Sequence, residues 1–96
     1  MLLEQGFLTS GPIKLKVMKS SSCHQNVASI WTQKKFGIVG VATGYALSDD
    51  GLWGQHSWGI LRDGLLETTE ARLKYFGVVF QGEKADFFAF SNSTQV

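Results

Sequence analysis

Apolar side chains recur at every second residue along much of the chain, whereas the spacing that marks a helix occurs in one stretch. A period of two is typical of β-strands, because successive side chains point to opposite faces. The pattern predicts strands at residues 13–19, 38–47, 52–61, 65–69, 75–80 and 85–90. Segments such as "SDDG" and "RDG" between them are typical of hairpin turns. We therefore expect one half-buried strand, one helix and then an antiparallel meander of about five strands.

The helix is predicted from about residue 23 to residue 36. Its apolar positions share one face at helical spacing, and they are Val27, Ile30 and Trp31. Ser22 and Gln25 fit a capping box at its start, and Gly37 fits the left-handed residue that ends a helix. Strand 38–47 carries small residues along one side, namely Gly40, Ala42, Gly44 and Ala46. Because small residues allow close approach, we expect the helix to pack near this side.

The length of 96 residues corresponds to one domain, 1–96, with an irregular lead-in at 1–12 and a frayed tail at 91–96. A hydrophobic content of 44% and a charged content of 18% are typical of a globular α+β protein. The net charge of +1 argues against a nucleic-acid or membrane-surface partner. With neither a signal-peptide pattern nor a long apolar run, a cytoplasmic protein is expected.

Three residues that suit nucleophilic chemistry follow one another along the chain. Cys23, the one cysteine, lies at the predicted start of the helix, His56 lies within a predicted strand, and Glu67 lies on the next strand. A helix N-terminus and an adjacent imidazolium lower the pKa of a thiol, and a carboxylate on the other ring nitrogen orients the imidazole. The alternative for Cys23 is an inert core thiol on the apolar helix face. Neighbouring His24 is expected to be exposed.

The length of the turn after residue 60 decides which acid meets His56. A two-residue Asp63–Gly64 turn sets Glu67 opposite Ile60, too far from His56 for contact. A three-residue turn, 62–64, sets Glu70 opposite His56 instead. A four-residue loop, 61–64, sets Glu67 opposite Trp58, on the face of His56 and within reach. Glu67 is the preferred acid and Glu70 the reserve, while Arg62 is another partner for an inward Glu67.

These residues also carry a resemblance. A cysteine opening a helix, then "HSW", a glycine-containing turn and "LLETT" resembles the core of the papain-like and transglutaminase-like superfamily. The resemblance implies a minimal core of that fold, with Cys23 as nucleophile, His56 as base and Glu67 as acid, and with Trp58 and Thr69 at their flanking positions. Glutamate here replaces the usual aspartate. The strings "CHQNVA", "QHSWG" and "ETTEARLKYFG" also resemble small uncharacterised bacterial proteins of this length.

The expected function is acyl transfer on an amide by a cysteine nucleophile, as peptide hydrolysis, glutamine deamidation or transamidation. A protein or peptide is the expected substrate. No metal and no cofactor are expected, because two histidines, one cysteine and scattered carboxylates lack ligand spacing. The alternative is a non-catalytic binding module or small inhibitor that uses an aromatic-rich sheet surface. In that case Cys23→Ser would leave function intact.

Overall fold

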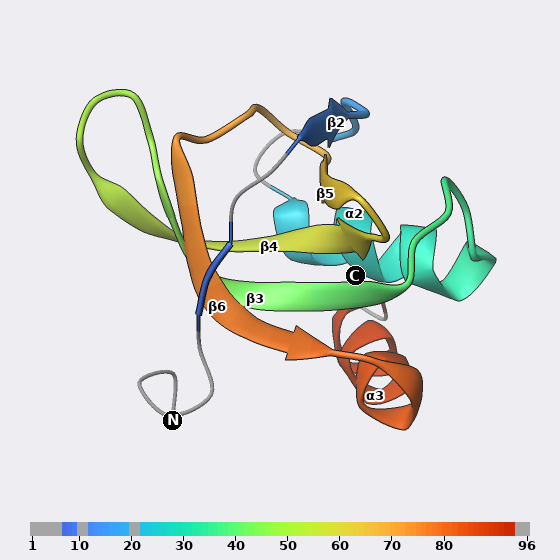
Figure 1. The fold of residues 1–96 in the computed structure, drawn as a ribbon. Helices are drawn as coiled ribbons and strands as arrows, with labels where there is room; N and C mark the ends of the chain where they lie inside the picture. Colours follow the sequence, from blue (N-terminus) through green and yellow to red (C-terminus); the bar gives the residue numbers. More distant parts are fainter. Residues whose placement is uncertain (1–6, 10–11, 20–21, 94–96) are drawn as a thin grey trace.

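The computed structural model describes residues 7–9, 12–19 and 22–93. It is an α+β structure, in which two helices and the strands of a single sheet account for the described elements (Figure 1). The elements in chain order are β1 (Phe7–Thr9), β2 (Ile13–Leu15), α2 (Cys23–Gln33), β3 (Gly40–Leu47), β4 (Trp53–Leu61), β5 (Gly64–Glu67), β6 (Lys74–Phe80) and α3 (Gly82–Ser93). The predicted α+β class is therefore confirmed.

The sheet is mixed, and its strands run in the order β1-β6-β3-β4-β5-β2. β3, β4 and β5 form the predicted antiparallel hairpins, but β2 pairs with β5 in parallel. The prediction of a simple meander is wrong, because β6 pairs with the far side of β3 rather than with β5. Gly44 faces Gly77 across that pair, and a Cβ on Gly44 would overlap the backbone of β6. The glycine pair therefore permits the close approach of the two strands.

The two faces of the sheet carry different cores. Val41 and Leu66 pack with α2 and α3 on one face, while Ala42 and Ala46 pack with aromatic rings on the other. The expectation that α2 lies on the small-residue side of β3 is wrong. The small residues instead make room for two rings, Trp58 and Tyr75, whose centroids are 4.9 Å apart. The larger side chains of the opposite face fill the space against α2.

Helix α2 begins at Cys23 and buries the predicted apolar face. Ser22 is the N-cap, but its side chain makes no capping hydrogen bond, so the predicted capping box does not form. The helix ends at Gln33 rather than at residue 36, because Lys34 takes the left-handed conformation (φ 53°) expected of Gly37. The Lys34 ammonium lies 3.9 Å from the centre of the Trp31 ring and donates to the Trp31 carbonyl, which stabilises this early end.

Helix α3 occupies the segment predicted to be strand 85–90, and this prediction is wrong. Ala85, Phe88 and Ala89 are buried at helical spacing in the core beside α2. A strand would place Phe88 on the side of Phe90, which is 69% exposed. The indole of Trp31 also donates to the Asp86 carboxylate at 2.9 Å. Docking on α2 therefore selects the helical period. The helix reaches Ser93, within the expected tail, and residues 94–96 lie outside the described residues.

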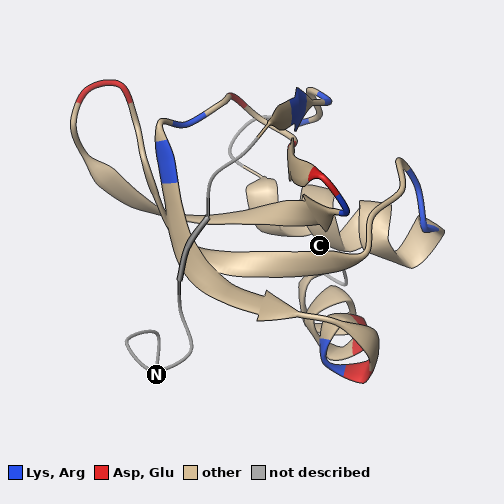
Figure 2. Ribbon diagram, viewed as in Figure 1, with Lys and Arg blue, Asp and Glu red and all other residues tan. Residues whose placement is uncertain are grey.

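The N-terminal strands differ from expectation in extent and burial. β1 lies within the predicted irregular lead-in and pairs with β6. β2 covers only Ile13–Leu15, and its apolar side chains are exposed rather than half-buried. The edge position next to the short β5 gives them no second layer to pack against. Figure 2 shows that Lys, Arg, Asp and Glu lie in loops, on β2, near the ends of other strands and on α3, leaving β3 and β4 without them.

Candidate active site

His56 points from β4 into the face that carries the aromatic rings. It lies opposite Gly44 on β3, and its ring stacks near that of Trp58, with centroids 6.0 Å apart and planes at 23°. Because only 3% of the residue is exposed, both ring nitrogens need partners within the protein.

Glu67 is one of these partners. Gly59 pairs with Leu66 and Ile60 with Leu65, which carries Glu67 to the level of Trp58. This register, with Glu67 opposite Trp58, is the one that the sequence analysis linked to a four-residue loop. Leu61 and Gly64 also pair, however, so the turn itself has two residues. The Nε2 atom of His56 lies 2.9 Å from Oε1 and 3.0 Å from Oε2 of Glu67.

Glu70, the reserve acid, and Arg62, the alternative partner for Glu67, lie apart from the His56–Glu67 pair. Glu70 is exposed in the connection from β5 to β6, and that connection forms no helical turn. Its backbone carbonyl accepts a hydrogen bond from the Arg72 guanidinium. Arg62 is exposed in the β4–β5 turn. The partner of the inward Glu67 is therefore His56, as preferred from the sequence.

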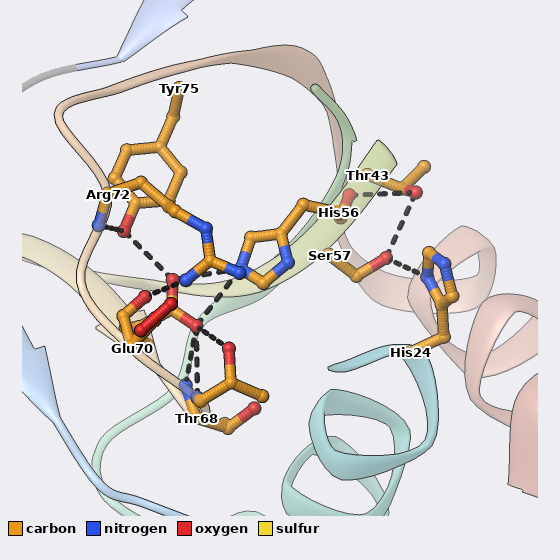
Figure 3. A network of polar contacts seen from close by, with 10 residues as sticks. His24, Thr43, His56, Ser57, Thr68, Glu70, Arg72 and Tyr75 are labelled. Atoms are coloured by element: carbon orange, nitrogen blue, oxygen red, sulfur yellow. Dashed lines mark hydrogen bonds and ion pairs between the residues drawn. The ribbon is translucent and has the colours of Figure 1, made fainter. Parts of the chain in front are cut away.

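Several further donors surround the Glu67 carboxylate (Figure 3). The backbone N–H groups of Thr68 and Thr69 donate to Oε2, at 3.1 and 3.0 Å, and the Thr69 hydroxyl donates at 2.9 Å. The hydroxyl of Tyr75 donates to Oε1 at 2.8 Å. Burial alone would raise the pKa of Glu67, but His56 and these donors outweigh it and lower the pKa. The buried group is therefore a carboxylate.

Cys23 is the other partner of His56. It is the first residue of α2 and is partly buried, and the His56 ring and the backbone of Ser57 and His24 lie close enough to its sulfur to lower the pKa of the thiol. Because Nε2 of His56 faces Glu67, the nitrogen left for the sulfur is Nδ1.

The interactions among Cys23, His56 and Glu67 determine the protonation of the thiol and of the imidazole. Burial raises the pKa of Cys23, but the hydrogen bonds from His56, Ser57 and His24, together with the charge of His56, bring it below the ordinary value. Burial would likewise lower the pKa of His56, but Cys23 and Glu67 raise it to about 9. Near neutral pH His56 is therefore an imidazolium, and it favours the thiolate of Cys23, the form in which a cysteine is nucleophilic.

A cleft of about 470 Å³ opens onto this pair. Its walls come from four separate stretches of chain, at 17–18, 23–24, 55–56 and 69–72. Cys23 and His56 both line it, whereas Glu67 lies behind His56 and is fully buried. A molecule in the cleft can therefore reach the sulfur and the imidazole, while the acid stays shielded from water.

His24 is not the exposed residue that the sequence predicted. Its ring is partly buried and lines the cleft, and its Nδ1 atom hydrogen-bonds the hydroxyl of Ser57. Ser57 and Tyr75 were missed as members of the site. Ser57 had a weak signal, a polar residue that alternation places on the helix-facing side of β4. Tyr75 had none, because its approach to Glu67 depends on the non-local pairing of β6 with β3.

Among the described residues, no group of three or more His, Cys, Asp and Glu side chains has the arrangement that holds a metal ion. Neither described helix has the length and apolar character needed to cross a bilayer. Comparison of the chain with protein-family models, curated proteins and solved structures finds no match. The resemblance to the papain-like and transglutaminase-like superfamily therefore stays a prediction.

Proposed function

We propose that the protein is an acyl-transfer enzyme that attacks an amide with the Cys23 thiolate, on a minimal papain-like or transglutaminase-like core. One observation supports this most. His56 lies between the Glu67 carboxylate, which contacts its Nε2 atom at 2.9 Å, and the Cys23 thiol, whose pKa it lowers, and Cys23 and His56 both line an open cleft. A core thiol has no need of an oriented imidazole, whereas nucleophilic catalysis requires one.

The reaction begins when the Cys23 thiolate attacks the amide carbonyl carbon and forms a carbon–sulfur bond. The backbone N–H of Cys23, at the first position of α2, has no partner within the helix and stabilises the developing oxyanion. His56 passes its proton to the departing amine nitrogen as the carbon–nitrogen bond breaks, which leaves a thioester. Water or an amine then attacks the thioester, His56 accepts the proton of that nucleophile, and the thiolate departs.

Glu67 holds the imidazole and favours its charged form throughout. Its five donor contacts fix the carboxylate, so the His56 ring keeps one orientation toward the sulfur. Thr69 supplies two of these contacts and Trp58 packs beside the His56 ring. Both are positions that the resemblance singles out, which supports the proposed superfamily core. The identity of the acceptor, water or an amine, separates hydrolysis and deamidation from transamidation.

Alkylation of Cys23 by iodoacetamide tests the thiolate. At pH 6.5 only about 1% of an ordinary thiol is ionised, so we expect Cys23 to react at least about tenfold faster than N-acetylcysteine. His56→Ala removes the imidazolium and should return the rate to that of N-acetylcysteine. A rate in the wild-type protein that matches N-acetylcysteine and ignores His56→Ala would favour the non-catalytic binding module.

Acyl transfer itself is measured with 4-nitrophenyl acetate. The expected result is a burst of 4-nitrophenolate and a mass increase of one acetyl group on Cys23, followed by turnover. Cys23→Ser should abolish the burst, because a serine hydroxyl at this position stays protonated. With an amide substrate, the rate should fall as the pH rises past about 9, where His56 loses the proton that the leaving group needs.

A further inference from the structure

Four polar groups form a second hydrogen-bonded chain on the other side of β4. Nδ1 of His24 contacts the Ser57 hydroxyl, which lies 3.0 Å from the Thr43 hydroxyl, which in turn lies 3.4 Å from the backbone carbonyl of His56 (Figure 3). Ser57 is fully buried, so these groups depend on one another for partners. The chain joins His24 to the backbone of the residue that activates the thiol.

The direction of each hydrogen bond follows from the number of protons. A carbonyl oxygen only accepts, so Thr43 uses its one hydroxyl proton on His56. Ser57 must then donate its proton to Thr43, and it can only accept from His24. Nδ1 of His24 therefore carries a proton. In the neutral ring this leaves the lone pair on Nε2, which has no hydrogen-bond partner among the described residues.

His24 lines the same cleft as the sulfur, and it comes next to Cys23 in the chain. The other titratable or charged side chains that line the cleft are Cys23, His56, Glu70 and Arg72. Burial and the positive charge of His56 both lower the pKa of His24, so the ring is neutral at pH 7. The cleft thus pairs a nucleophile with an adjacent hydrogen-bond acceptor of fixed tautomer.

We propose that Nε2 of His24 accepts a hydrogen bond from an N–H group of the substrate next to the carbonyl under attack. The proposal rests on the acyl-transfer function proposed above and narrows the substrate to acyl groups that carry such an N–H, as residues of a peptide do. Catalysis at the sulfur needs only a carbonyl, whereas this acceptor selects a substrate that supplies a donor.

Two activated esters that differ in one group test the proposal. N-acetylglycine 4-nitrophenyl ester carries the N–H, and acetoxyacetic acid 4-nitrophenyl ester has an oxygen in its place. Acylation bursts are compared after division by the rate of each ester with free cysteine. Because one hydrogen bond contributes roughly 1 kcal/mol, the wild-type protein should prefer the N–H ester about fivefold. The preference should disappear at acid pH, where protonation of His24 turns its acceptor into a donor.

The variant His24→Asn removes the acceptor but keeps an N–H near the position of Nδ1 for Ser57. It should bring the preference for the N–H ester to about one, and a melting temperature near that of the wild-type protein shows that the variant is folded. Ser57→Ala, which keeps the ring but frees its tautomer, should lower the preference with both esters still reactive. This second variant serves if His24→Asn fails to fold.

The possible failures are distinguishable. Bursts with both esters but no N–H preference in the wild-type protein, or a preference that His24→Asn retains, would overturn the role of His24 alone. Loss of rate with both esters and with iodoacetamide in His24→Asn would indicate a structural role and would also overturn it. If His24→Asn released the acyl group more slowly but kept the preference for the N–H ester, His24 would be a base that activates water, and the proposal would be overturned. The absence of any burst in the wild-type protein would overturn the acyl-transfer function and this proposal with it.

Discussion

The carboxylate of Glu67 is fully buried, and its stability depends on the donors around it. An unpaired buried carboxylate costs several kcal/mol, which the imidazolium and the hydrogen bonds offset. The same contacts that make the charge tolerable also orient His56. The stability of the fold and the activation of Cys23 are therefore coupled at this residue.

Glu67→Gln should lower the free energy of unfolding by about 3 kcal/mol, because the amide brings its own N–H group to a site filled with donors. Alkylation of Cys23 at pH 6.5 should also fall, by up to about tenfold for each unit by which the pKa of Cys23 rises once the carboxylate no longer supports the imidazolium. Urea unfolding and iodoacetamide kinetics measure the two effects.

Glu70→Gln is the matched control. Glu70 is exposed in the connection that follows β5, so the change should alter the free energy of unfolding by no more than about 0.5 kcal/mol. Equal effects of the two substitutions on alkylation would contradict the assignment of Glu67 as the orienting acid.

The dependence of stability on pH follows from the same charges. The pKa of His56 is raised from 6.5 to about 9, so its contribution is complete below 6.5 and is lost as the pH rises toward 9. The pKa of Glu67 is lowered, so its contribution is present above 4.5 and is lost in acid. The pKa of Cys23 is also lowered, so its contribution grows as the pH rises toward 9 and opposes that of His56.

Cys23→Ala should remove the contribution of the thiolate, which offsets the loss of the His56 contribution as the pH rises. The variant should be most stable between about pH 5 and 6.5, and its free energy of unfolding should then fall by about 1 kcal/mol or more toward pH 9. The wild-type protein should change less over the same interval. Urea titrations at pH 5.5, 7 and 8.5 compare the two proteins. A variant whose stability stays level or rises above pH 6.5 would mean that His56 is neutral in the folded state.

At the residue scale, the sequence predicted the members of the site better than their surroundings. The order of chemical types along the chain pointed to Cys23, His56 and Glu67, and the structure brings these three together. The prediction for His24 was wrong because a helical pattern does not show which other element lies against the first turn, here Ser57 of β4. The Tyr75 hydroxyl reaches Glu67 because β6 returns to pair with β3, and no local pattern encodes that pairing.

At the scale of elements, α3 is the clearest departure from the sequence pattern. The string "ADFFAF" suits either a strand or a helix, since Phe favours strands and Ala favours helices. Docking decides between them, because only the helical period brings Ala85, Phe88 and Ala89 together against α2. Short apolar segments of this kind remain ambiguous until their partner is known.

Two adjacent phenylalanines provide a test of this packing. Phe88 is 8% exposed and lies in the helix-side core, whereas Phe87 is 72% exposed. Phe88→Ala should therefore lower the free energy of unfolding by about 3 kcal/mol, and Phe87→Ala by no more than about 0.5 kcal/mol. Urea unfolding measures both. Similar losses for the two variants would contradict the orientation of α3.

At the scale of the whole molecule, the cleft belongs to no single element. Its four stretches, at 17–18, 23–24, 55–56 and 69–72, meet only when the sheet and α2 are in place. The α+β class and the β3–β4–β5 hairpins were predictable because adjacent segments pair locally. The mixed sheet and the return of β6 to β3 were not, because they depend on long-range pairing at the Gly44–Gly77 contact.

Loss of the thiolate should therefore coincide with global unfolding. In a urea series at pH 6.5, the fast alkylation of Cys23 should fall to the rate of N-acetylcysteine at the midpoint that circular dichroism gives. The reason is that the imidazole, 33 residues further along the chain, reaches the sulfur only through the folded sheet. Slow alkylation that sets in well before the circular dichroism transition would mean that the cleft opens independently of the core.

Because His56 stacks on Trp58, a change of charge at the site should alter tryptophan fluorescence. The indole lies beside a ring that is cationic while the sulfur is a thiolate, and a neighbouring cation quenches indole emission. Conversion of the sulfur to a thioester removes the anion that holds this cation in place. The fluorescence of Trp58 should then increase during acylation and decrease when the acyl group is released, so turnover could be followed without a label.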